Sequence, residues 1–302
     1  MKAVERRTWS GTAVLAWGLS SFAFLSVLVG LLLLLRDSWP VWQAEGLGFV
    51  TGERWFFRQE EFGAAAMIYG SFVVTVIAVL LAAPVGFLAA LFGTEFLPRK
   101  FRLPIKLTTE LLAGIPSVVY GLLGVLLLRD WIYELLEDFD PLSGDTLLTA
   151  AVLLAVMILP TLMSLADEAF AGIGGAQRMA ARGLGLGRAQ TALAVTLPQA
   201  LPGLIAAVLL GFGRALGETI AVFLVVGRQD NQWPEQLLSP EPIISAGQTL
   251  TSKLGGSETN IAYGDSLHWG AVTGLGLILL IIICGVTFAG LALQNYTGRG
   301  NV

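Results

Sequence analysis

Two ionisable side chains lie inside an apolar segment that is long enough to cross a lipid bilayer. The segment reads LIAAVLLGFGRALGETIAVFLVVG and contains Arg214 near its middle and Glu218 four residues later. A charge at the bilayer centre costs about 2.5–3.5 kcal/mol on insertion scales, so such residues usually face a protein interior or an aqueous path and have a function. This spacing places both on one helical face. They could form a self-neutralising pair, or Arg214 could bind an oxyanion through its planar donors while Glu218 orients it.

A second apolar segment carries polar groups beside a proline. It reads GIPSVVYG, from Gly114 to Gly121. Pro116 removes a helical hydrogen bond and frees a carbonyl, which membranes tolerate only where neighbours or water satisfy it. The hydroxyls of Ser117 and Tyr120 could then line a path; a kink without substrate contact is the alternative.

A third segment, between two apolar runs, is rich in alanine and glycine: AGIGGAQRMAARGLGLGRAQTALAVTLPQALPG. Its pattern predicts a short helix, a turn at Gly183, Gly185 and Gly187, and a second helix up to Pro198 lying against the membrane face. The glycines do not form a nucleotide loop, because no strand precedes them and the chain has no G-x-x-x-x-G-K-[ST] sequence. We therefore expect no ATP site in this chain.

Bond-making chemistry has little support in the composition. The chain has one histidine, His268, and one cysteine, Cys284, so neither a histidine metal site nor a histidine triad is predicted. We expect His268 to be an interfacial residue beside Trp269, and Cys284 to be a small core residue. A membrane enzyme would need a catalytic cluster, so the sequence does not predict one.

The elements that must position these residues are membrane spans. Hydrophobic residues make up 55% of the 302 residues and charged residues 13%, whereas a soluble domain has about a quarter charged residues. A helix needs about 20 apolar residues to cross a membrane. We expect an all-α integral membrane protein with a single domain over 1–302, a core over about 68–293, and an additional N-terminal helix and outer loop over 11–67. The six predicted spans are Gly11–Leu35, Ile68–Gly93, Leu107–Leu128, Leu147–Leu165, Leu201–Val226 and Trp269–Leu293.

Lysine and arginine predict the orientation. The N-terminal segment, the second and fourth connections and the C-terminal tail hold most of them, and cytoplasmic loops carry such an excess. Both termini are therefore expected on the cytoplasmic side. The outer connections are acidic, so an anionic substrate would have to arrive on a carrier. The basic residues assigned to the cytoplasm are Lys2, Arg6, Arg7, Arg99, Lys100, Arg102, Lys106, Arg178, Arg182, Arg188 and Arg299.

The alanine-rich segment resembles the cytoplasmic signature of ABC importer permeases, E-A-A, three residues, G, nine residues, I, one residue, L-P. Ala180 and Ala181, then Gly185, then Leu197 and Pro198 reproduce that spacing. The resemblance implies a coupling helix that docks on a separate ATPase. Met179 stands where the family usually has glutamate.

Two further motifs narrow the resemblance to phosphate-specific ABC importer permeases. GIPSVVYG and GRALGET (Gly213–Thr219) resemble their membrane subunits, as do FGAAAMIYGS (Phe62–Ser71), APVG (Ala83–Gly86) and ILPT (Ile158–Thr161). Ser38-Trp39-Pro40 and Trp55 are similar to the PstC type. The resemblance implies the type I importer fold, with a translocation path that Arg214, Glu218, Thr219, Ser117 and Tyr120 would line.

The same resemblance implies partners and a location. They are a second, PstA-like permease, two ATPase subunits that bind ATP and Mg²⁺, a periplasmic phosphate-binding protein, and the bacterial inner membrane; no cofactor in this chain and no nucleic acid are expected. Sulfate, molybdate or a phosphonate is an alternative cargo. A proton-coupled secondary transporter, with Glu218 titrating, is an alternative class, although no internal repeat of the kind common in such transporters is evident.

Overall fold

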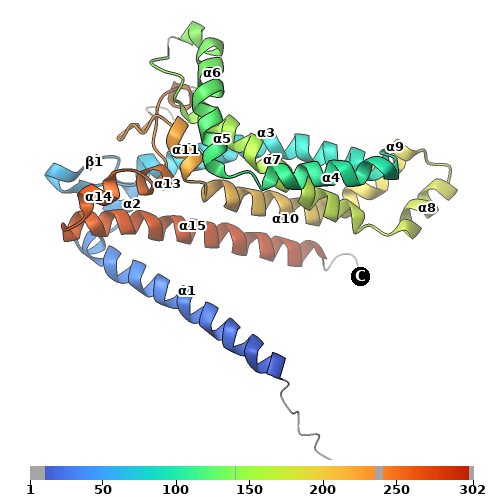
Figure 1. The fold of residues 1–302 in the computed structure, drawn as a ribbon, viewed down its shortest axis with the longest axis horizontal. Helices are drawn as coiled ribbons and strands as arrows, with labels where there is room; N and C mark the ends of the chain where they lie inside the picture. The colour runs from blue at the N-terminus through green and yellow to red at the C-terminus, as the bar shows by residue number, and fades with distance from the viewer. Residues whose placement is uncertain (1–10, 140, 235–240, 299–302) are drawn as a thin grey trace, which may run out of the picture.

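The computed structural model describes residues 11–139, 141–234 and 241–298, and it is mainly helical (Figure 1). Its N-terminal half contains α1 Gly11–Ala44, α2 Gly48–Thr51, β1 Trp55–Phe56, η1 Phe57–Gln59, β2 Glu61–Phe62, α3 Ala65–Glu95, α4 Arg99–Ala113, α5 Ser117–Leu123, η2 Gly124–Leu128, α6 Arg129–Leu135 and η3 Glu137–Phe139. The rest contains α7 Leu147–Ala171, α8 Gly175–Gly183, α9 Arg188–Thr191, η4 Ala192–Thr196, α10 Leu197–Leu216, α11 Ile220–Val225, α12 Glu241–Ile244, α13 Leu250–Leu254, α14 Glu258–Ala262 and α15 Ser266–Gly298.

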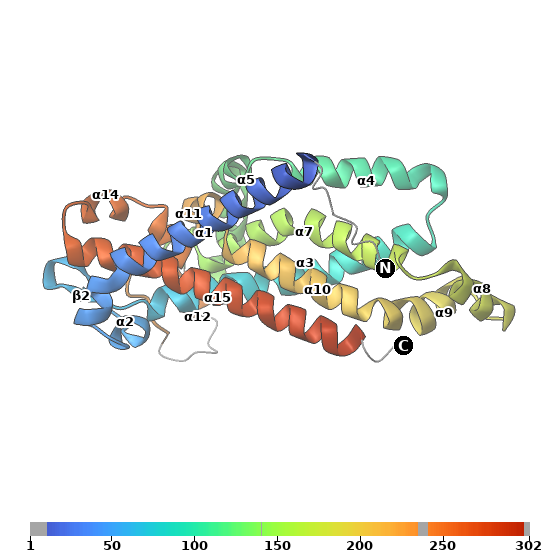
Figure 2. The ribbon, with the colours of Figure 1, turned by 90° about the horizontal axis from the view of Figure 1, so that it is seen from below.

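The long helices run roughly along one axis of the molecule, and the short outer helices gather at one end (Figures 1 and 2). Among the described residues, five helices are long and apolar enough to span a membrane, and a bent pair would provide a sixth. The prediction of about six spans is therefore confirmed, with two of them shaped differently from the expectation. The basic residues expected at the two termini lie outside the described residues.

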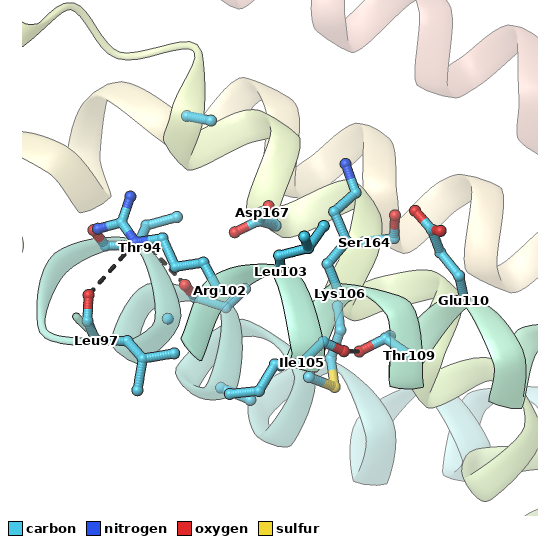
Figure 3. A pocket seen from close by; sticks show the side chains of 15 residues that line it. Thr94, Leu97, Arg102, Leu103, Ile105, Lys106, Thr109, Glu110, Ser164 and Asp167 are labelled. Carbon is cyan, nitrogen blue, oxygen red and sulfur yellow. Dashed lines mark hydrogen bonds between the residues drawn. The ribbon is translucent and has the colours of Figure 1, made fainter. Parts of the chain in front are cut away.

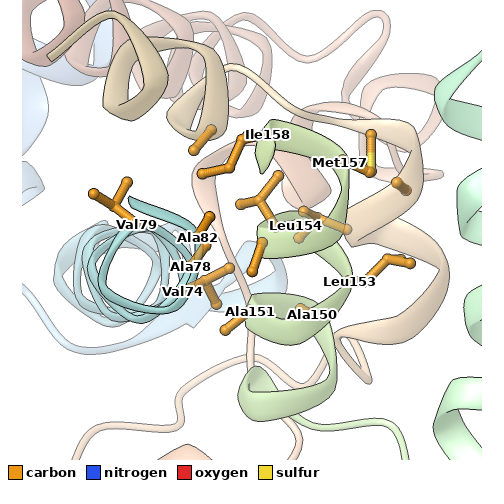
Figure 4. Close-up of a cluster of buried hydrophobic side chains, with 14 of the residues drawn as sticks. Val74, Ala78, Val79, Ala82, Ala150, Ala151, Leu153, Leu154, Met157 and Ile158 are labelled. Atoms are coloured by element: carbon orange, nitrogen blue, oxygen red, sulfur yellow. The ribbon is translucent and has the colours of Figure 1, made fainter. Parts of the chain in front are cut away.

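The central core lies between α3 and α7, where small side chains let the two backbones approach closely. Ala78 and Ala82 of α3 face Ala151, Leu154 and Ile158 of α7, and all five are buried (Figure 4). α10 packs on the same core: a Cβ built at its Gly211 would lie 2.7 Å from Leu162 Cδ2.

The first helix is longer than predicted and largely separate from the bundle. It continues past Leu35 to Ala44, through Pro40, because its outer end packs on α15, where Val41 is fully buried against the cluster that includes Leu275. Within the most apolar part of the helix no residue is buried inside this chain.

The third predicted span is not one kinked helix. α4 and the continuous helical run Ser117–Leu135 meet at 84°, and α5 and α6 project away from the long axis (Figure 1). The chain turns at Gly114 and Pro116, because proline cannot donate a hydrogen bond and disfavours helical geometry in the residue before it.

The fifth predicted span differs at both of its ends. α10 stops at Leu216, and α11 starts anew at Ile220, instead of one helix reaching Val226. At its start, the second helix of the alanine-rich segment is not a separate surface helix, because α9, η4 and α10 form one helical run from Arg188 to Leu216. Pro198 lies inside this run, just after the π-helical turn η4, where the regular hydrogen-bond ladder is already interrupted.

The end of the molecule that carries α2, α13 and α14 has a compact structure of its own (Figure 1). β1 and β2 form a short antiparallel hairpin, an addition to the expected all-α fold, and Trp55 and Phe62 of this hairpin are buried in a cluster with Met67 and Leu250. Cys284 is exposed on α15 rather than in the core, so that prediction is wrong.

Candidate functional site

The centre of the candidate site is the gap between α10 and α11. Gly213 and Gly217 lower the helical propensity here, each by about 1 kcal/mol relative to alanine, and α10 ends with Gly217 as its C-cap. The hydroxyl of Thr219 donates to the Gly217 carbonyl at 3.3 Å, which satisfies one of the acceptors that the break frees. The GRALGET sequence is therefore a helix break rather than a helix interior.

Arg214 lies in the last turn of α10, with its side chain exposed in the single chain. Its Nη1 donates to Thr161 Oγ1 of α7 at 2.7 Å. A helix C-terminus favours a nearby cation, because the last carbonyls carry partial negative charge. Among the described residues Arg214 is thus oriented by a neutral hydroxyl and forms no ion pair with a carboxylate.

Glu218 does not pair with Arg214 within the described part of the chain. Its Oε1 accepts a hydrogen bond from the backbone N–H of Ala221 at 3.3 Å, at the start of α11. The predicted pairing assumed one continuous helix with both residues on one face, and the break at Gly217 removes that geometry. The Arg–Glu pairing is therefore corrected, while the two side chains stay near the same break.

The two polar segments, about a hundred residues apart in the sequence, meet because α5 packs on α11. A Cβ built at Gly121 would lie 3.1 Å from the Ala221 Cα, so a larger residue here would require the two helices to move apart by a few tenths of an ångström. The Tyr120 hydroxyl, however, donates to the Leu112 carbonyl at 3.0 Å across the bend between α4 and α5. Tyr120 thus stabilises the bend, and Ser117 is half-buried at the start of α5.

A small polar cavity of about 10 Å³ lies beside Glu218. It has roughly the volume that one water molecule needs. Four buried hydroxyls line it, from α3 and from the segment that begins α13: those of Ser71, Thr75, Thr249 and Thr251. The sequence predicts no role for these side chains, although Ser71 ends the FGAAAMIYGS motif.

A larger cavity of about 370 Å³ lies between α3, α4 and α7 (Figure 3). Arg102 and Lys106 of α4 contribute positive charge to its lining, and Asp167 of α7 and Glu110 of α4 contribute negative charge. Ser164, another lining residue, is one helical turn beyond Thr161 on α7. Polar lining thus extends along α7 from the Arg214 contact toward the end of the molecule that carries α8.

The alanine-rich segment forms that end of the molecule (Figure 2). α8 is followed by Gly185 with φ of +89°, a conformation that side chains disfavour, so the turn expected at this glycine is confirmed. Of the predicted coupling residues, Ala180, Gly185 and Pro198 are exposed, Leu197 is half-buried and Ala181 is buried.

Apolar side chains are exposed on the same segment. Met179 is 70% exposed and Leu184 84% exposed. Met179, at the position of the missing glutamate, therefore points out of this chain and offers an apolar contact there instead of a carboxylate.

The end of the molecule that carries α13 and α14 holds a largely buried charged cluster that sequence reasoning missed. The Glu258 carboxylate accepts hydrogen bonds from Trp55 Nε1 at 2.8 Å and lies 2.7 Å from His268 Nε2 and 3.2 Å from Lys253 Nζ. Lys253 also donates to Asp230 at 2.6 Å. Burial raises the pKa of Glu258, but the Trp55 hydrogen bond, the Lys253 charge and the hydrogen bonds from His268 and Lys253 together hold it below the ordinary value.

His268 is 3% exposed, so it is buried within the chain; its expected position at the membrane border stays a prediction. Its ring stacks on the rings of Phe57 and Phe62, which belong to the hairpin and its connecting turn. In the described residues no group of three or more His, Cys, Asp or Glu side chains could hold a metal ion.

Comparisons with known proteins agree with this architecture. A family model described as "Binding-protein-dependent transport system inner membrane component" matches residues 82–299. The chain is 35% identical over 279 residues to the phosphate transport system permease protein PstC of Mesorhizobium japonicum, covering 87% of this chain and 81% of that protein. It is 36% identical over 236 residues to the probable ABC transporter permease protein YqgH of Bacillus subtilis, covering 78% and 73%.

A solved structure of the MetNI methionine ABC transporter, in an inward-facing conformation, has a chain of similar fold. The TM-score is 0.53 with 19% identity, over 78% of this chain and 94% of that chain. Since the family model covers well over half of the sequence, this chain belongs to the family of binding-protein-dependent transport system inner membrane components, the membrane-spanning permeases of ABC importers.

Proposed function

We propose that this chain is the permease subunit of an ATP-driven inorganic phosphate importer. The observation that carries the proposal is Arg214: a cation at a helix break within the membrane bundle, held by the neutral hydroxyl of Thr161 rather than by a carboxylate. Its remaining guanidinium donors match an oxyanion bidentately. The names of the relatives support phosphate as that anion.

The path would be completed by a second permease of the PstA type. Arg214 would contact the anion transiently near the α10–α11 break, with Glu218, Thr219 and Ser117 beside it. Tyr120 would hold the bend that places α5 against α11. A periplasmic binding protein would deliver phosphate past the acidic outer connections.

Energy would come from two ATPase subunits, which would bind the ATP and Mg²⁺. They would dock on α8 and the following turn, where Met179 and Leu184 expose apolar surface beyond the spans. The chain would reside in the bacterial inner membrane with both termini cytoplasmic, and it would catalyse no bond chemistry itself.

The test is uptake of labelled phosphate into vesicles that contain the complete complex with its binding protein. We expect ATP-dependent uptake that excess sulfate leaves intact and that Arg214→Gln abolishes while the complex still assembles. Arg58→Gln, which removes an exposed charge on the outer hairpin, is the matched control and should transport normally.

Other outcomes separate the alternatives. Uptake of sulfate, molybdate or a phosphonate in place of phosphate would refute the cargo and leave the importer intact. Uptake without ATP or the ATPase would refute the importer and favour a proton-coupled secondary transporter.

A further inference from the structure

Glu95, the last residue of α3, is a buried carboxylate at the end of the molecule that carries α8. Its side chain is 2% exposed. A carboxylate in such a place must be paired and hydrogen-bonded, because its desolvation is otherwise strongly unfavourable. Three side chains surround it: Arg178 Nε at 2.7 Å, Thr196 Oγ1 at 3.0 Å and Arg182 Nη2 at 3.7 Å.

The same Arg178 guanidinium binds the end of α7. Nη1 donates to the Ile173 carbonyl and Nη2 to the Phe170 carbonyl, both at 2.7 Å. Carbonyls at a helix C-terminus lack intrahelical partners, and they favour a cation. Arg178 therefore joins α8, on which it lies, to the ends of both α3 and α7.

Thr196 extends the cluster to a fourth helix. It belongs to η4, which leads directly into α10, and it is fully buried. Glu95 thus lies where three spanning helices and α8 converge, above an apolar layer that includes Phe170 and Ala192. α10 is also the helix that carries Arg214 at its opposite end.

The two faces of α8 are therefore different. Arg178, Arg182 and Ala181 face the bundle, and Met179 and Ala180 face outward. A force applied to the outward face would reach α3, α7 and α10 through hydrogen bonds and ion pairs of defined geometry.

We propose that Glu95 and Arg178 are positioning residues that make α8 move as one body with α3, α7 and α10, so that ATPase closure moves the helix break at Arg214. This inference rests on the proposed function, since it takes α8 as the ATPase docking element. Loss of the pair leaves the ATPases docked and active but transmits less of their movement.

The test measures phosphate transported per ATP hydrolysed, using the complete complex in vesicles. For Glu95→Gln we expect co-purification of the ATPase, retained ATP hydrolysis, and a transport-to-hydrolysis ratio lowered by about fivefold or more, the lower end of typical coupling between sites. Glu168→Gln, an exposed carboxylate on the last turn of α7, is the matched control and should keep the ratio.

A purely structural role predicts a different result, because misfolding lowers hydrolysis and transport together and leaves their ratio unchanged. The double variant Glu95→Gln/Arg178→Gln should lower the ratio by less than the product of the two single changes, because residues of one network are not additive. A ratio lowered by the full product would contradict a shared pair.

If Glu95→Gln does not assemble, Thr196→Val decides, because it keeps the ion pair and removes only the hydrogen bond from η4. A lowered transport-to-hydrolysis ratio supports the proposed positioning role of the Glu95 cluster, and an unchanged ratio overturns it. Absence of ATP-dependent uptake by the unmodified complex would refute the proposed function instead. Normal uptake by the unmodified complex, with an unchanged ratio in Glu95→Gln, would refute only the positioning role of Glu95 and Arg178.

Discussion

The contact between Arg214 and Thr161 makes a direct prediction about substrate affinity. Thr161→Val keeps the shape of the side chain and removes the hydroxyl that accepts from Arg214 Nη1 at 2.7 Å. Hydrogen bonds to charged groups contribute about 1.5–3 kcal/mol when buried. Arg214 is exposed in the single chain, so solvent screening reduces this to about 1 kcal/mol.

If Thr161 orients Arg214 for the anion, that loss lowers uptake at subsaturating phosphate by roughly fivefold, since 1.4 kcal/mol corresponds to a factor of ten. Uptake at saturating phosphate should change much less, because the arginine itself remains. Initial rates over a range of phosphate concentrations measure both quantities.

The matched control is Thr273→Val. Thr273 is also half-buried in a spanning helix, but its hydroxyl bonds only the carbonyls of its own helix, those of Trp269 and Gly270. An unchanged or improved apparent affinity in Thr161→Val, with Thr273→Val normal, would show that Thr161 does not prepare Arg214 for the anion.

Three further predictions concern coupling, packing and pH. Gly185→Ala should weaken ATPase co-purification, because φ of +89° costs a side chain about 1–2 kcal/mol; undiminished co-purification would contradict a role for this turn in docking. Leu162→Ala should lower the thermal midpoint of the detergent-solubilised protein, because removing a fully buried leucine side chain costs about 2–5 kcal/mol of stability; an equal midpoint would mean that α7 and α10 do not pack at Gly211. Glu258 contributes stability that is present above the ordinary glutamate pKa of 4.5 and is lost as pH falls through its lower folded value. Thermal melts below pH 4.5 should therefore show a loss that is smaller in Glu258→Gln, and identical pH profiles would refute the ionised cluster.

The membrane-spanning character, the approximate number of spans and the short helix and glycine turn of the alanine-rich segment could be predicted from the sequence. Each depends on a local property of the chain. An apolar run of sufficient length spans a bilayer wherever it occurs, and Gly185 adopts a positive φ because a glycine lacks a Cβ. The motifs around Arg214 and Pro116 also identified the two segments that meet at the α5–α11 contact.

The tertiary structure decided how those segments are shaped and which groups they contact. A single helix through Gly217 would have paired Arg214 with Glu218; instead, α7 supplies Thr161, 53 residues away, as the partner of Arg214. Beyond the break at Gly217, α11 packs on α5, α7 and α13.

Burial of charge was likewise invisible in the linear sequence. Glu95 reads as a polar residue at the border of a span, and His268 as an interfacial one. Both are buried, because Arg178 and Thr196 reach Glu95 and Glu258 reaches His268 from other elements. A spacing pattern reports which residues can share one helical face, but a buried charge depends on partners that only the packed chain brings within hydrogen-bond distance.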